Sequence, residues 1–127
     1  MQPDEHALTP VAAERRLLVL DNEMALAELA LRRARDTEVE KKHEFEAAER
    51  RAFLSADCPR PTRGGHTVAD REVYVADQAA AEQRAFDIAT SARQGAYDHL
   101  ETVGKQSMIC MALLRSVTTA YNMSGVS

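Results

Sequence analysis

One short segment rich in proline and glycine separates two long stretches that contain neither residue. Residues 11–58 and residues 66–94 lack both, whereas residues 57–65 hold two of the four prolines and two of the five glycines. Proline removes a helical hydrogen bond, and glycine costs a helix interior about 1 kcal/mol, so stretches without them favour uninterrupted helices. The sequence therefore predicts an all-α fold, a long antiparallel helical hairpin that resembles a coiled coil.

Threonine caps mark where both predicted helices begin. Thr9 precedes Pro10, and a threonine hydroxyl accepts hydrogen bonds from the free N–H groups of a first helical turn, where proline is tolerated. Thr67 and Asp70 have the spacing of a capping box, in which each side chain binds the other residue's backbone N–H. We therefore expect one helix over about residues 10–56 and a second that begins at about residue 67.

A turn at residues 57–66 is expected to connect the two helices, and the second helix is expected to end at about residue 122. Together they are expected to form a single domain of residues 1–127. Gly95 and Gly104 lie in the interior of the second helix. Each glycine weakens a helix relative to alanine without ending it. A continuous helix is the expectation, and a kink or a split near Gly104 is the alternative.

Apolar residues recur at heptad-like spacing along both predicted helices, and polar residues interrupt both series. The first series is broken at Glu38 and Lys41, and the second at Arg93 and Ser107. Around the first break most side chains are polar, which is typical of a solvated helix face with i,i+4 pairs such as Glu38 with Lys42. Many members of the second series are alanine, so the helices can approach closely but bury little area.

The far end of the second helix is apolar on every side. If the chain reverses at residues 57–66, a residue of the first helix lies opposite the residue of the second helix for which the two numbers sum to about 122. Residues 108–114 then lie at the open end of the hairpin, far from the turn. These seven apolar residues are more than one partner helix can cover, so either the N-terminal segment folds over them or a second chain does, and self-association is the favoured alternative. The leading prediction is a non-enzymatic hairpin module that forms a homodimer or higher oligomer and binds an unidentified protein partner. The candidate interface residues are Met108, Ile109, Met111, Leu113, Leu114, Val117, Leu17 and Leu18.

Arginines around the predicted turn indicate an alternative function. Within residues 50–66 four arginines stand against one acidic residue, Asp57. A basic hairpin tip can contact phosphates, as a nucleic-acid-binding accessory of replication or recombination would. The formal charge of the whole chain is −4, so any attraction to nucleic acid has to be local. The candidate phosphate contacts are Arg50, Arg51, Arg60 and Arg63.

No residue pattern predicts a catalytic, cofactor or metal site. Glu40 and His43 have the E-x-x-H spacing of di-iron bundles, but such a site needs a second motif of this kind. Cys58 has His66 nearby in sequence, yet a short exposed turn offers no pocket to exclude water. Cys58 and Cys110 are both expected to be free thiols. We therefore expect no enzyme activity.

The sequence also bears on location. No apolar stretch reaches the roughly 18 residues that a membrane-spanning helix needs, and the first residues are not the cationic start of a signal peptide. A cytoplasmic protein without membrane contact is the expectation. Tyr97 and Glu101 match a Y-x-x-x-[DE] spacing, which resembles the export signal of helical hairpins secreted by type VII systems. A secreted hairpin of that type is the second alternative.

The segments on both sides of the turn carry a resemblance. Residues 51–54 end the first helix in an aromatic–leucine pair, and residues 65–72 open the second with Gly-His-Thr-Val-Ala-Asp-Arg-Glu. Together with residues 100–107 and 116–121, these segments resemble small uncharacterised helical proteins encoded by actinobacterial phages and prophages, over roughly residues 40–121. The resemblance implies a phage-encoded accessory protein in the host cytosol, of the kind found near replication and recombination genes.

Overall fold

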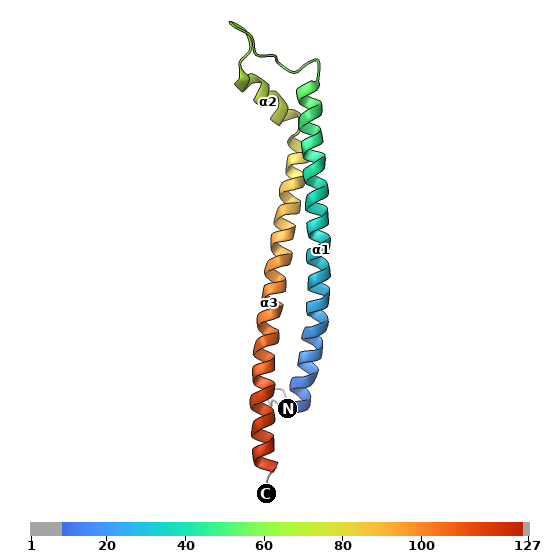
Figure 1. Cartoon of the computed structure of the whole chain (residues 1–127), viewed down its shortest axis with the longest axis vertical. Helices are drawn as coiled ribbons and strands as arrows, with labels where there is room; N and C mark the ends of the chain where they lie inside the picture. Colours follow the sequence, from blue (N-terminus) through green and yellow to red (C-terminus); the bar gives the residue numbers. More distant parts are fainter. Residues whose placement is uncertain (1–8, 126–127) are drawn as a thin grey trace, which may run out of the picture. The chain divides into compact units, whose positions relative to one another are not determined.

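The computed structural model describes residues 9–125, which are helical apart from short connections. Helix α1 covers Pro10–Leu54, helix α2 covers Val68–Gln78, and helix α3 covers Ala80–Gly125 (Figure 1). Long helix α1 packs against α3 in the antiparallel sense. The predicted all-α helical hairpin is therefore confirmed.

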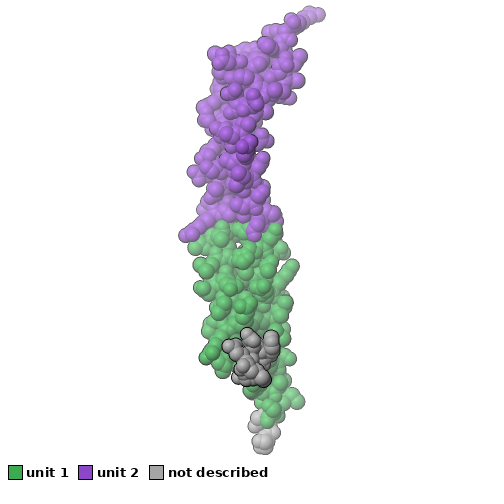
Figure 2. Space-filling view, turned by 180° about the vertical axis from the view of Figure 1, so that it is seen from behind, with its two compact units in different colours: residues 1–31, 96–127 green, residues 32–95 purple. Residues whose placement is uncertain are grey.

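The chain divides into two compact units, each of which pairs a segment of α1 with a segment of α3. Unit 1 consists of residues 1–31 and 96–127, and unit 2 consists of residues 32–95 and also contains α2 (Figure 2). The predicted end of the first helix, at residue 56, lies within two residues of its observed end.

The predicted threonine caps are both present. Thr9 Oγ1 accepts a hydrogen bond of 3.1 Å from the backbone N–H of Ala12. At the start of α2, Thr67 Oγ1 accepts from the Asp70 N–H at 3.2 Å, and the Thr67 N–H donates to Asp70 Oδ2 at 2.8 Å. The hydrogen bonds from Thr67 hold the pKa of Asp70 below its usual value, because they favour the ionised carboxylate.

The second helical arm is interrupted at a position that the sequence did not indicate. α2 ends at Gln78, Ala79 has a φ of −99° and a ψ of 9°, and α3 begins at the next residue. The expected continuity through Gly95 and Gly104 is confirmed, and the alternative of a split at Gly104 is wrong. Alanine has the highest helix propensity, so tertiary packing and not local preference places this break.

The packing of α2 explains the interruption. Ala79 is fully buried, and the change of direction there lets α2 lie beside the last turns of α1 (Figure 1). From this position the Tyr74 hydroxyl donates a hydrogen bond of 3.3 Å to Ser55 Oγ. A helix that continued straight through Ala79 would give up this contact.

The turn between α1 and α2 is built as the sequence indicates, with one exception. Gly64 has a φ of +77°, the left-handed conformation that favours glycine. The Thr62 N–H donates to the His66 carbonyl at 3.0 Å and closes the loop. Cys58 was expected in an exposed turn but is buried, with its thiol 3.8 Å from the Pro59 carbonyl oxygen. Both Cys58 and Cys110 are free cysteines, as expected.

Unit 1 contains the large side chains of the core. Leu20 and Val103 are each 1% exposed, and Leu31 is also buried. The buried Cys110 thiol contacts the Ala13 carbonyl oxygen at 3.6 Å, close to the expected pairing of Ala13 with residue 109. Such a contact between a side chain and a neighbouring backbone requires close helix packing, which small residues permit. The remaining buried apolar residues of this unit are Ala13, Ala27 and Cys110.

Unit 2 has a core of small side chains. An aromatic contact joins Phe45 of α1 and Phe86 of α3, whose ring centroids are 6.1 Å apart with an interplanar angle of 35°. Both rings are half-buried. The fully buried apolar residues described in this unit are Ala48, Ala52, Cys58, Ala79 and Ala89. Because each of these buries little area, apolar burial stabilises unit 2 less than unit 1.

We expect Leu20→Ala to lower the free energy of unfolding by about 2–5 kcal/mol, because it leaves a cavity in the main core of unit 1. Leu54→Ala removes the same atoms from a side chain that is 73% exposed, and we expect a change within about 0.5 kcal/mol. Urea unfolding followed by circular dichroism measures both. Equal losses for the two variants would contradict this assignment of the core.

Candidate interaction surfaces

An ion pair joins the two long helices within unit 2. Arg93 Nε donates a hydrogen bond of 2.9 Å to Glu38 Oε2, and the two side chains are 30% and 22% exposed. The Thr90 hydroxyl also hydrogen-bonds the Glu38 carboxylate. The polar residues that interrupt the two apolar series therefore meet each other. Most residues around Glu38 are exposed, as the predicted solvated face requires, but Glu38 itself is partly buried and its ion-pair partner is Arg93.

These contacts lower the pKa of Glu38. The hydrogen bond from Arg93 is the main cause, the Thr90 hydrogen bond adds to it, and partial burial opposes both. The ionised carboxylate is thus the form that the folded protein favours.

The pairing register of unit 2 differs from the prediction. A sum of about 122 would place Glu38 opposite residue 84 and Phe45 opposite residue 77, whereas their partners are Arg93 and Phe86. The two pairs of unit 2 sum to 131, whereas Ala13 with Cys110 in unit 1 sums to 123. One sum therefore does not describe both units.

Exposed apolar side chains concentrate in unit 1. Of the 18 large hydrophobic residues that are exposed in the described part of the chain, 12 belong to this unit. They come from both of its helical segments: Val11, Leu18, Val19, Leu26, Leu29, Tyr97, Met108, Ile109, Met111, Leu113, Tyr121 and Met123. Contiguous exposed apolar surface marks interaction sites.

The predicted interface residues of α3 do not share one surface. Met108 and Ile109 are 72% and 61% exposed, and Met111 and Leu113 are also exposed. Leu114 and Val117 are half-buried. Some of these apolar residues therefore pack between the two helices, and others lie on the surface.

Two of these residues border a groove within unit 1. Ile109 and Leu113 of α3 lie across the groove from Ala13, Arg16 and Leu20 of α1, and its volume is about 220 Å³. Gln106 and Cys110 complete the lining. This apolar hollow is the part of the predicted interface that can receive a side chain from a partner.

The first turns of α1 expose apolar residues that are not among the predicted interface residues. Leu17 is half-buried and Leu18 is 68% exposed, so these two predicted residues point in different directions. Val19 and Leu26, seven residues apart, are also exposed. The seven-residue spacing of Val19 and Leu26, outside the series that packs on α3, is the sequence signal that could have identified them.

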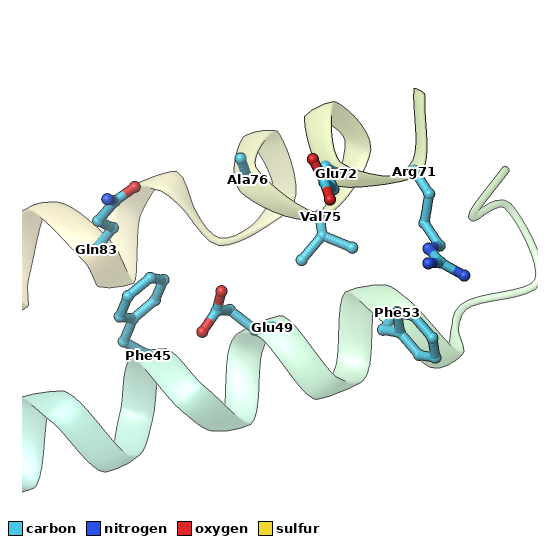
Figure 3. A pocket seen from close by; sticks show the side chains of 8 residues that line it. All are labelled: Phe45, Glu49, Phe53, Arg71, Glu72, Val75, Ala76 and Gln83. Atoms are coloured by element: carbon cyan, nitrogen blue, oxygen red, sulfur yellow. The ribbon is translucent and has the colours of Figure 1, made fainter. Parts of the chain in front are cut away.

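Unit 2 has a groove between the end of α1 and α2. Phe45, Glu49 and Phe53 of α1 face Arg71 and Val75 of α2 across it (Figure 3), and its volume is about 340 Å³. The Arg71 guanidinium lies 5.0 Å from the centroid of the Phe53 ring, a cation–π contact. Glu72, Ala76 and Gln83 complete the lining.

The candidate phosphate contacts lie on separate surfaces. Arg50 borders a groove with Phe53 and Leu54, whereas Arg51 borders a different hollow with Tyr74 and Glu82. All four predicted arginines, which include Arg60 and Arg63 in the loop, are exposed. The structure does not gather Arg50 and Arg51 into one basic patch.

Residues 9–125 contain no group of three or more histidine, cysteine, aspartate or glutamate side chains placed to hold a metal ion. Glu40 and His43 are both exposed. Among the described helices, none has both the length and the apolar character that crossing a membrane requires.

Comparisons with protein-family models, with curated proteins and with solved structures found no match to this chain. The contacts and surfaces described above are therefore the basis for its functional interpretation.

We expect the folded protein to lose stability as the pH falls below about 4.5, because the pKa of Glu38 is lowered from that value in the folded state. The stabilisation is present above the pKa of the unfolded chain and is lost as the pH falls through the folded pKa. Glu38→Gln should therefore show a smaller decrease in melting temperature between neutral and acidic pH. Glu40→Gln, an exposed control outside the ion pair, should retain the full decrease. Identical pH profiles for both variants would argue against the role of the ion pair.

Proposed function

We propose that the protein is a non-enzymatic helical-hairpin module that self-associates through unit 1 and acts by binding proteins. The observation that carries this proposal is the imbalance within unit 1 between buried and exposed apolar residues. Three large aliphatic side chains, Leu20, Leu31 and Val103, are buried, whereas 12 large hydrophobic side chains are exposed. An exposed apolar surface of this kind is stabilised when a partner covers it.

The proposed role is that of an accessory protein, of the kind implied by the resemblance to phage-encoded helical proteins. A protein of this kind needs no catalytic residues, because it would act by binding other proteins through its surface. The apolar groove beside Ile109 and Leu113 supports this role, since interface centres are built from apolar pockets that exclude water.

We expect the wild-type protein to have at least twice the monomer mass at micromolar concentrations in light scattering. The double variant Ile109→Glu with Leu113→Glu should be monomeric, because it places two charges on the apolar groove. A matched control, Val73→Glu with Ile88→Glu, changes two similarly exposed residues of unit 2 and should associate as the wild type does. A monomeric wild type would refute the proposal.

A second candidate function is nucleic-acid binding by the tip arginines. Its support is the exposure of Arg50, Arg51, Arg60 and Arg63, and the separation of Arg50 from Arg51 makes this support weaker. The third candidate, a type VII-like secreted hairpin, is supported by the exposure of Tyr97 and Glu101 on α3.

We expect no measurable binding to single-stranded or duplex DNA at low salt. Fluorescence anisotropy over a series of salt concentrations tests this expectation. Each phosphate contact would contribute a slope of about −0.9 to a plot of log affinity against log salt on duplex DNA. Binding with such a slope that Arg60→Ala with Arg63→Ala weakens would favour the nucleic-acid function instead.

A further inference from the structure

We propose that the groove beside Ile109 receives Leu26 of a second copy of this chain, in an antiparallel twofold dimer. This inference rests on the self-association proposed above and specifies its contact. It names the groove in unit 1 that is filled, the side chain that fills it and the relative direction of the two copies. Three observations carry it, namely the lining of the groove, the position of Leu26 and the two charges Arg16 and Glu23 on the same side of α1.

The charges of α1 favour a second copy as the occupant, because an antiparallel twofold dimer pairs Arg16 of one copy with Glu23 of the other.

Leu26 lies on the side of α1 at which Arg16 borders the groove. Arg16 lines the groove, and Val19 and Leu26 follow it on α1 by three and ten residues. At 100° per residue, these two positions lie within about 80° of Arg16 around the helix axis, on the side away from Leu17. Leu26 is 59% exposed, so its side chain is available to a partner.

Twofold symmetry brings the groove and Leu26 together. In a twofold dimer both copies use the same surface. In an antiparallel arrangement, a residue that precedes the centre by a given number of positions lies level with the residue of the other copy that follows it by the same number. With that centre between Val19 and Leu20, Leu26 of one copy lies level with Ala13 of the other. Ala13, Ile109 and Leu113 line the groove, so Leu26 meets it as a knob meets a hole. The symmetry repeats this contact, and both grooves are filled.

The same arrangement pairs two opposite charges. Arg16 and Glu23 lie on this side of α1, and within the described residues neither has an ion pair or a side-chain hydrogen bond. About the same centre, Arg16 of one copy lies level with Glu23 of the other, again twice. A parallel dimer would place Arg16 beside Arg16 instead, which repels. Charge complementarity therefore selects the antiparallel direction.

The first test is a single substitution with a matched control. Leu26→Glu should raise the dimer dissociation constant by at least 30-fold, as expected for a side chain that fills a desolvated pocket of an interface. Leu18→Glu places the same charge on the same helix, at a side chain that is 68% exposed but lies outside this side, and should change the constant less than 3-fold. Sedimentation equilibrium measures both, and circular dichroism checks the helical content. If Leu26→Glu loses its helical content, Leu26→Ala replaces it, with an expected increase of at least 10-fold.

A charge exchange tests the direction. Arg16→Glu alone and Glu23→Arg alone should each weaken the dimer, because like charges then meet twice. The double variant Arg16→Glu with Glu23→Arg should restore the wild-type constant to within 3-fold. A wild type that is monomeric would refute the proposed function itself. A wild type that associates, but with Leu26→Glu equal to Leu18→Glu or with no restoration in the double variant, would refute only this contact.

Discussion

The ion pair between Glu38 and Arg93 fixes a helix pair that has few other means to fix its register. Every fully buried apolar residue described in unit 2 is an alanine or a cysteine, and a surface of small side chains packs almost equally well in several registers. A carboxylate and a guanidinium in the seam remove this freedom. A shift of α3 by one turn would break the ion pair and its hydrogen bond of 2.9 Å and leave both partly buried groups without their partner. The position of Phe86 on Phe45 and of α2 beside the end of α1 follows from this register.

The helices themselves could be predicted because their signals are local. Proline and glycine end helices through their own backbone chemistry, and the Thr67–Asp70 box forms within one turn. The interruption at Ala79 could not be predicted, because it serves contacts such as Tyr74 with Ser55 that are far apart in sequence. The register of unit 2 differs because the prediction applied one sum to the whole hairpin, whereas the pairs sum to 131 in unit 2 and Ala13 with Cys110 to 123 in unit 1. Yet Glu38 and Arg93 had both been recognised as interruptions, and matching one interruption to the other would have given the register.

The candidate surface was predicted in part. Residues 108–114 are apolar on all sides, which indicates that some of them must be exposed but not which ones. The structure decides this, since Leu114 is half-buried whereas Ile109 and Leu113 border a groove that α1 completes. Leu26 was missed because one apolar series per helix was assumed. The exposed apolar residues in the first half of α1 lie outside that series, and a helix with two apolar sides needs two neighbours.

The alanine seam of unit 2 also determines how this protein can vary. In an ordinary core the dangerous substitutions are those that remove atoms, because they leave cavities. At Ala48, Ala52 and Ala89 the dangerous substitutions are those that add atoms, because these methyl groups are buried and a larger side chain would overpack the site. The sequence of this unit is therefore constrained by an upper limit on side-chain size at a few positions and is free at most others. Related chains could thus differ widely in sequence and still be recognised by small residues at these spacings, with one acidic and one basic residue at the level of Glu38 and Arg93.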